Sequence, residues 1–172
     1  MGRGQAMRVL GIVLPVAVVT VVIGVIATTA GPQIWTAATT RVLEGDTTID
    51  IEGAPGQATI DVPGGWAVRP APFDRSRVGV VTPDGGTVIE VQVLAGVDAR
   101  TAIDDAAPVP VGRTSTEQIG EGRMLLHARS ADGSVISGAV VSGQTLVRFT
   151  ASPVEGFEAE LARLLDSIQV HG

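Results

Sequence analysis

Cysteine is absent from this sequence of 172 residues. The chain therefore offers no disulfide, no thiol nucleophile, no thiolate metal ligand and no cysteine for lipid attachment. Lysine, asparagine and tyrosine are absent as well. Every basic side chain is an arginine, which stays protonated, so no lysine is available as a catalytic base or for Schiff-base chemistry. Without asparagine the chain also has no N-glycosylation site.

Acidic residues are missing from the N-terminal part of the chain, because all 18 of them lie at or after Glu44. Nine of the 12 arginines lie in the same part, so its formal charge is 9 − 18 = −9. A domain of that charge repels the phosphate backbone of DNA or RNA. We therefore exclude nucleic acid as a partner.

Charged residues of either sign are absent from residues 9–30, which read VLGIVLPVAVVTVVIGVIATTA. A helix of this length spans roughly 33 Å, enough to cross a hydrocarbon core of about 30 Å. Arg3 and Arg8 precede the segment, whereas the first basic residue after it is Arg41. The positive-inside rule then places the N-terminus in the cytoplasm and the rest outside. We expect Arg8 and Trp35 to mark the two membrane interfaces of the anchor.

A cleaved signal peptide is the alternative interpretation of this segment, since small residues at 28–31 suit a signal peptidase. Signal-peptide apolar regions usually run about 7 to 15 residues, so the greater length favours a retained anchor. The sequence thus predicts a cytoplasmic N-terminus (1–8), a transmembrane helix (9–30), a juxtamembrane tether (31–57) and an extracytoplasmic domain (58–172).

Alternating apolar and polar residues predict strands in the outer domain. An edge strand is expected at 47–52, within the tether. Two hairpins are expected where Asp84-Gly85 and Asp132-Gly133 supply tight turns. The remaining strands are predicted at 58–62, 66–68, 77–82, 87–94, 114–119, 123–130, 134–141 and 145–151.

Two helices are predicted in the outer domain, the first at 98–107. The second begins at Ser152-Pro153-Val154-Glu155, which has the spacing of a capping box. Its apolar stripe is Phe157, Leu161, Leu164, Leu165 and Ile168. The predicted fold class is therefore α+β, a central antiparallel sheet with a C-terminal amphipathic helix packed on one face, preceded by a transmembrane helix.

Two short stretches, IDVPGGW at 60–66 and LLDSI at 164–168, resemble the PsbP/MOG1-like superfamily of small accessory α/β domains. The resemblance covers about residues 58–170. It implies an antiparallel sheet with helices on its faces and a binding or accessory role, and it carries over no functional residue. The chain departs from that pattern in having little helix between its early strands.

One cluster of candidate site residues can be read from the strand at 123–130. Arg123, His127 and Arg129 share one face by alternation, and Arg148 on the last strand is expected on the same side. These four residues are typical of a small patch that binds an anion or an acidic partner. The alternative is a solvated sheet face with cross-strand ion pairs, which the sequence favours because such pairs are common.

No other pattern indicates catalysis or metal binding. His171 is expected to fray at the C-terminus, and two histidines so placed do not make a metal site. The acids at 46–52 and 104–105 lack the spacing of a calcium loop. No serine stands in a G-x-S-x-G elbow. We therefore predict no catalytic residue, no cofactor and no metal.

The sequence favours a single-pass protein of the cell membrane whose outer domain is a binding or accessory module and not an enzyme. Its partners are the lipid bilayer and proteins of the envelope or membrane. The alternatives are a secreted domain with a cleaved signal peptide, a small envelope hydrolase that uses His127, and a subunit of a larger membrane complex.

Overall fold

The computed structural model describes residues 39–54, 56–120 and 122–171. The folded unit begins at Thr40. It takes in β1 (Arg41–Val42) and β2 (Thr47–Glu52), which lie within the range predicted as a tether. The predicted transmembrane helix at 9–30, with Arg8 and Trp35, lies outside the described residues. Among the residues that are described, no helix combines the length and apolar character needed to cross a membrane.

The folded unit consists of two antiparallel sheets. Sheet A has eight strands in the order β1-β4-β5-β6-β10-β9-β8-β7, and sheet B has three in the order β11-β3-β2. The remaining strands are β3 (Gln57–Val62), β4 (Ala67–Ala71), β5 (Asp74–Val81), β6 (Val88–Ala95), β7 (Ser115–Gln118), β8 (Met124–Arg129), β9 (Ile136–Ser142), β10 (Thr145–Ser152) and β11 (Gln169–His171).

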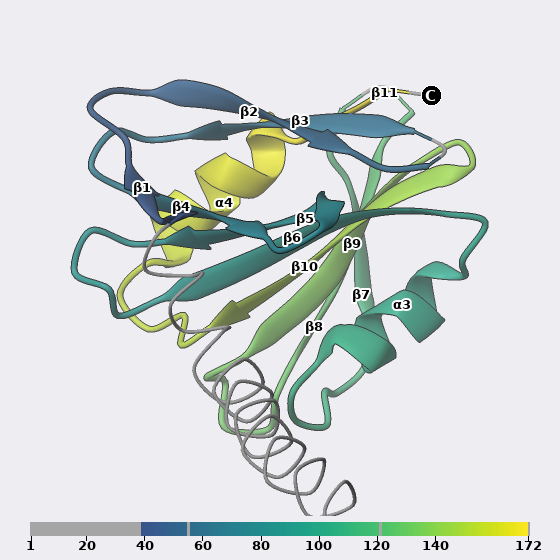
Figure 1. The fold of residues 1–172 in the computed structure, drawn as a ribbon. Helices are drawn as coiled ribbons and strands as arrows, with labels where there is room; N and C mark the ends of the chain where they lie inside the picture. Colours follow the sequence, from purple (N-terminus) through teal and green to yellow (C-terminus); the bar gives the residue numbers. More distant parts are fainter. Residues whose placement is uncertain (1–38, 55, 121, 172) are drawn as a thin grey trace, which may run out of the picture. The chain divides into compact units, whose positions relative to one another are not determined.

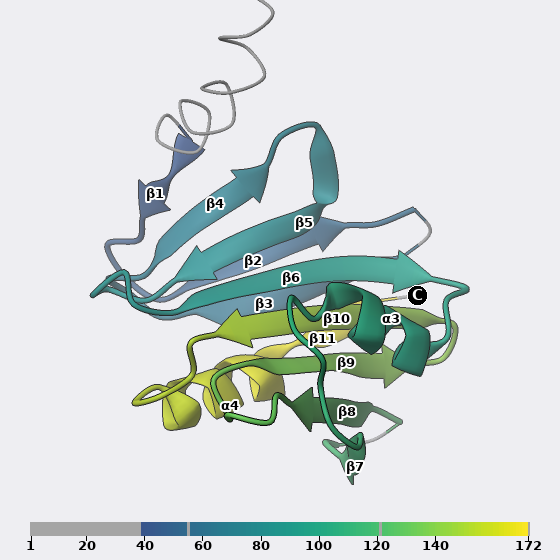
Figure 2. The same ribbon diagram turned by 90° about the horizontal axis from the view of Figure 1, so that it is seen from below.

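Sheet B covers one face of sheet A, and helix α4 (Glu158–Ser167) lies between the two sheets (Figure 1). We call this the inner face of sheet A. Helix α3 (Ala99–Ala106) packs on the opposite, outer face, against β9 and β10 (Figure 2). Strand β2 of sheet B faces β5, so α4 fills the space over the other half of sheet A.

The main core lies on the inner face, where alternate residues of each strand are buried. In β6, Ile89, Val91 and Val93 are buried there, whereas Glu90 is exposed on the outer face. This alternation was predicted from the sequence and is confirmed. Removing such side chains from water is the main source of stability in a domain of this size. A smaller outer core joins α3 to sheet A through Ala102, Ile103, Ala128, Ala139 and Leu146.

The predicted α+β class is wrong, because the described chain is largely β. Eleven strands are accompanied by only the two helices α3 and α4 in the folded unit. Two segments account for much of the difference. Residues 41–52 pair with the sheets instead of forming a tether, and residues 169–171 form β11 on β3 instead of a frayed end. A second sheet, and not a helical layer alone, therefore covers the central sheet.

The predicted capping box at the start of the last helix is also wrong. Ser152 ends β10, and α4 begins at Glu158 with Phe157 as a cap that makes no side-chain hydrogen bond. The intervening turn is fixed by tertiary contacts, since Val154 is buried and its N–H donates to the Ser134 carbonyl at 3.2 Å. Four residues of the predicted apolar stripe, Leu161, Leu164, Leu165 and Ile168, are buried, which confirms that part of it. The fifth, Phe157, is only half-buried because it stands before the first turn of the helix.

Both predicted hairpins form, and their turns are built alike. In the β5–β6 turn, Thr82 Oγ1 donates to Asp84 Oδ1 at 2.6 Å and accepts from the Thr87 N–H at 3.0 Å. In the β8–β9 turn, Ser130 Oγ donates to Asp132 Oδ1 at 2.5 Å and accepts from the Val135 N–H at 3.0 Å. The following Gly85 and Gly133 have positive φ, which glycine adopts without strain.

Candidate functional site

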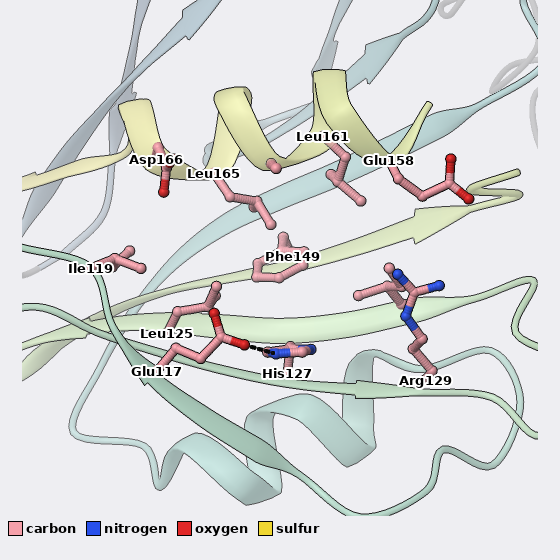
Figure 3. Close-up of a pocket in the computed structure, with 12 residues that line it drawn as sticks. Glu117, Ile119, Leu125, His127, Arg129, Phe149, Glu158, Leu161, Leu165 and Asp166 are labelled. Atoms are coloured by element: carbon pink, nitrogen blue, oxygen red, sulfur yellow. Dashed lines mark hydrogen bonds and ion pairs between the residues drawn. The ribbon is translucent and has the colours of Figure 1, made fainter. Parts of the chain in front are cut away.

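An open groove of about 290 Å³ separates α4 from the edge of sheet A that is formed by β8 and β7 (Figure 3). It forms because α4 lies over β10 and β9, while the sheet continues past the helix to β8 and β7. The groove is lined by Glu117, Ile119, Leu125, His127, Arg129, Ile136, Phe149, Glu158, Leu161, Ala162, Leu165 and Asp166.

The floor of the groove is apolar. Leu125, Ile136 and Phe149 come from three neighbouring strands of the inner face, and all three are buried. Leu161 and Leu165 of α4 form the facing wall (Figure 3). Such an apolar floor, bordered by a few polar groups, is the usual composition of a ligand or peptide site.

A glycine shapes this floor. Gly138 on β9 lies between His127 on β8 and Phe149 on β10 in one cross-strand row. A Cβ at Gly138 would stand only 2.4 Å from Phe149 Cζ, so the ring edge occupies the space that a side chain would need. The absence of a side chain therefore lets the Phe149 ring extend across β9 toward His127.

The rim of the groove carries the polar groups. His127 Nε2 lies 3.1 Å from Glu117 Oε1, and the His127 side chain is 26% exposed. The pair follows from register, because Glu117 is opposite Leu125 and thus shares the inner face with His127. Arg129, Glu158 and Asp166 complete the rim and make no ion pair among the described residues.

Helix α4 is held in place at its C-terminal end by two polar links. The Arg123 guanidinium donates to the Ile168 carbonyl, which caps the helix. A cation suits that position because helix C-termini carry partial negative charge. Ser167 Oγ accepts from the Asp61 N–H of β3 at 3.0 Å and so ties the helix to sheet B. These links fix the C-terminal end of the helix beside the groove.

The four residues of the predicted cationic patch do not come together. Arg123, His127 and Arg129 do share the inner face, as alternation indicated. However, Arg123 is committed to the end of α4, and His127 is paired with an acid. Arg148 lies on the outer face, where its Nη2 donates to Gln92 Oε1 at 2.7 Å. With Glu117, Glu158 and Asp166 at the rim, the groove is more acidic than basic.

The surroundings of Arg148 form a second, smaller hollow of about 200 Å³ on the outer face. Its polar lining includes Arg77 paired with Glu90, together with Asp105 of α3. Opposite charges balance there, and its apolar lining is slight. We therefore regard it as a cross-strand polar network of the kind that stabilises solvated sheet faces.

The groove holds part of what a hydrolase would need. His127 and Glu117 form a base with an orienting acid, and Ser115 stands opposite His127 in the β7–β8 ladder. Yet no hydrogen bond joins Ser115 to His127, although both belong to the described residues, and a nucleophile is activated through such a bond. The described residues also include no group of three or more His, Asp and Glu side chains placed for a metal ion.

Sequence reasoning found His127 and Arg129 but missed the remaining groove residues. Glu117 and the floor are contributed by strands whose pairing and register are set by the whole sheet. The one available signal was Leu125, which shares the parity of His127 and therefore indicated that this face of β8 is partly buried and not simply solvated.

Comparison with known proteins leaves the family open. No protein-family model matches the chain, and no curated protein does either. The chain is similar to a protein from Bacteroides thetaiotaomicron whose crystal structure is known. The alignment covers 76% of this chain and 50% of that protein, at 11% sequence identity and a TM-score of 0.44. The chain thus spans about half the length of that protein. A similarity this weak supports no inference about family, ligand or activity.

Proposed function

We propose that this chain is a single-pass, membrane-anchored binding or accessory module whose extracytoplasmic domain holds an apolar segment of a membrane or envelope protein in the α4 groove. The observation that carries the proposal is the groove itself. It has an apolar floor of Leu125, Ile136 and Phe149, open to solvent beside a short helix that is fixed at its end. Grooves of this type accept side chains of a partner peptide.

The charges on the rim of the groove limit the kind of partner segment that it can bind. Three carboxylates, Glu117, Glu158 and Asp166, surround the floor, against the single guanidinium of Arg129. An apolar segment flanked by basic residues would place its charges against the carboxylates. An anionic segment would be repelled both by the rim and by the domain charge.

The membrane anchor is supported by the uncharged segment at 9–30 and by its flanking arginines. An anchor would confine the groove to the membrane surface and raise its effective concentration near membrane partners. The resemblance to accessory domains of the PsbP/MOG1-like superfamily is consistent with a role of this kind. A cleaved signal peptide would instead release the same groove as a secreted module.

The groove is tested by photo-crosslinking in intact cells. Ala162 is an exposed α4 residue that lines the groove, and Ala159 is an exposed residue of the same helix that does not. A benzophenone amino acid at position 162 should give a discrete crosslinked product that is absent with the label at 159. Adding Ala162→Arg to a chain labelled at Glu158 should abolish the product. Equal products from 159 and 162 would contradict the proposal.

The anchor is tested separately, with tags at both ends of the chain. A full-length band in the membrane, trimmed by external protease to a short N-terminal fragment, is the expected result. A shortened soluble band that begins near Gly31 would show a secreted domain, and the membrane part of the proposal would fall.

The pair of His127 and Glu117 favours one second candidate, an envelope hydrolase. Hydrolysis would require Ser115 to reach His127 when a substrate is bound. Turnover of a series of nitrophenyl esters that is lost in both Ser115→Ala and His127→Ala would support it. Turnover that survives Ser115→Ala would reject it.

A further inference from the structure

The groove is bounded on one side by an edge of sheet A. Strand β7 is the last in the strand order and, among the described strands, pairs only with β8 (Figure 2). All four of its residues, Ser115–Gln118, are exposed. Two side chains that line the groove, Glu117 and Ile119, come from this strand and from the residue that follows it. A segment that occupies the groove would therefore also lie beside the free edge of β7.

The free edge of β7 carries backbone groups that point away from β8. The Ile119 N–H donates to the Arg123 carbonyl at 3.2 Å, which marks these two residues as a hydrogen-bonded pair of the ladder. Such pairs alternate along antiparallel strands, so the N–H and C=O of Glu117 also point toward β8, whereas those of Thr116 and Gln118 point outward. Within the described part of the chain, neither residue makes a backbone hydrogen bond on that side. Four backbone groups are therefore available to a further strand.

The opposite edge of sheet A is protected against a further strand. Strand β1 has only two residues there, and its neighbour β4 contains Pro70 and a register shift between Pro70 and Ala71. Short strands, proline and bulges are the usual devices that prevent the addition of a strand. Strand β7 contains no proline and keeps a continuous register with β8. Of the two edges of sheet A, the β7 edge is thus the one that suits an added strand.

The charge of Glu117 determines which strand fits this edge. Glu117 is the one charged residue of β7, and its side chain is 62% exposed. A second copy of the chain that used all four outward groups would pair Thr116 with Gln118 of that copy and would place the two Glu117 side chains opposite each other. Like charges directly opposite destabilise a pair of strands. An arginine or lysine opposite Glu117 would instead form a cross-strand ion pair beside the acidic rim of the groove.

We propose that the partner segment binds as an extended strand that adds to β7, with a basic residue opposite Glu117 and apolar side chains in the α4 groove. This inference rests on the proposed function and adds the conformation of the partner to it. Hydrogen bonds to the backbone of Thr116 and Gln118 supply affinity for an extended segment, whereas the groove floor and Glu117 select its side chains. Alternate residues of the added strand face the groove, since side chains along a strand alternate between the two faces of a sheet.

The main-chain hydrogen bonds are tested by Thr116→Pro in the full-length chain that carries the benzophenone amino acid at position 162. Proline removes an outward N–H but spares the β7–β8 ladder, because edge strands tolerate proline where the N–H faces solvent. Thr116→Val is the matched control, since it keeps both the N–H and the branched side chain. In intact cells, Thr116→Pro should abolish the crosslinked product and Thr116→Val should retain it. Gln118→Pro should act like Thr116→Pro, and the melting temperature of each purified variant shows that it is folded.

A second measurement does not depend on the folding of any proline variant. With the benzophenone amino acid at position 116, the chain should give the same product as with the label at 162, because the added strand lies directly beside this residue. Thr48 is the matched control, an exposed threonine on β2 at an edge of sheet B, and a label there should give no product. Mass spectrometry of the product should identify an arginine or lysine within the captured segment.

The possible failures can be told apart. A product at position 162 that survives both proline variants, without a product at position 116, would keep the groove as a binding site and overturn the added strand. A product of twice the mass of the chain, or a captured segment without a basic residue, would overturn the basic partner strand. If the parent chain labelled at 162 gives no product, the proposed function fails and this inference falls with it.

Discussion

The ring of Phe149 stands where a side chain on Gly138 would be. A Cβ at this glycine would lie 2.4 Å from Phe149 Cζ and 2.5 Å from the Leu126 carbonyl oxygen. The ring can turn, but the carbonyl belongs to the neighbouring strand β8 and cannot move without disturbing the ladder. This one residue therefore fixes both the packing of the sheet and the floor of the groove.

Gly138→Ala should lower the free energy of unfolding by about 1–3 kcal/mol, the usual cost of overpacking. Gly79→Ala is the matched control, because its Cβ would meet Arg69 atoms at an ordinary 3.6 Å. That substitution in β5 should change stability little. Urea unfolding followed by tryptophan fluorescence measures both variants. Equal stability of the two would show that the ring does not occupy the space beside Gly138.

Leu164→Ala should destabilise the domain by about 2–5 kcal/mol, since it leaves a cavity under α4. Leu164 is 1% exposed and lies in the inner core, on the side of the helix away from the groove lining. Arg163→Ala, on the exposed side of the same helix, should stay within about 0.5 kcal/mol of the parent. Similar melting temperatures for both variants would contradict the observed orientation of α4.

Arg123→Gln should cost about 1–3 kcal/mol, because the Ile168 carbonyl loses a charged donor at the end of α4. Arg129→Gln removes a charge from the same strand but breaks no ion pair among the described residues, so its effect should be near zero. Thermal unfolding distinguishes the two. If both arginines instead belonged to an anion-binding patch and neither stabilised the fold, both variants would show small and similar losses of stability.

The hydrogen bonds to Asp132 in the β8–β9 turn should make the stability of the domain depend on pH in the acidic range. The Ser130 hydroxyl, followed by the Ser134 N–H, lowers the pKa of Asp132 below its ordinary value. The unfolded chain therefore takes up the proton first as pH falls. The stabilisation is present above about pH 4 and is lost as the pH drops through the lowered folded pKa.

Asp132→Asn should accordingly lose less stability than the parent between about pH 5 and pH 2. Glu155→Gln is the control, because that carboxylate accepts no hydrogen bond among the described residues. Melting temperatures measured across the range provide the readout. A parallel decline for the parent and Asp132→Asn would show that the turn hydrogen bonds do not persist in solution.

Local patterns in the sequence were sufficient where one residue type decides the backbone. Asp-Gly pairs located both hairpins, because glycine supplies the positive φ that each turn needs. Alternation located most strands, and the spacing of Leu161, Leu164 and Leu165 gave the buried side of α4. The same local rules failed at Ser152, which they predicted to cap a helix. Ser152 instead ends β10, and the buried Val154 belongs to the turn that follows.

Local rules of this kind could not predict the groove, because its lining residues come from five separate helices and strands. His127 was recognised from its own strand, but its partner Glu117 depended on the β7–β8 register. Arg148 was placed on the wrong face, since the relative phase of two strands is fixed only when both are paired in a sheet.

By itself, the sequence determined the charge of the domain, the chemistry it lacks, the uncharged segment at 9–30 and the positions of the tight turns. These properties depend on composition and on interactions between near neighbours in the chain. Tertiary structure alone decided that residues 41–52 and 169–171 join the sheets, and that α4 leaves β7 and β8 uncovered. Those features depend on pairing between distant segments, whose free energy comes from burial shared across the whole fold.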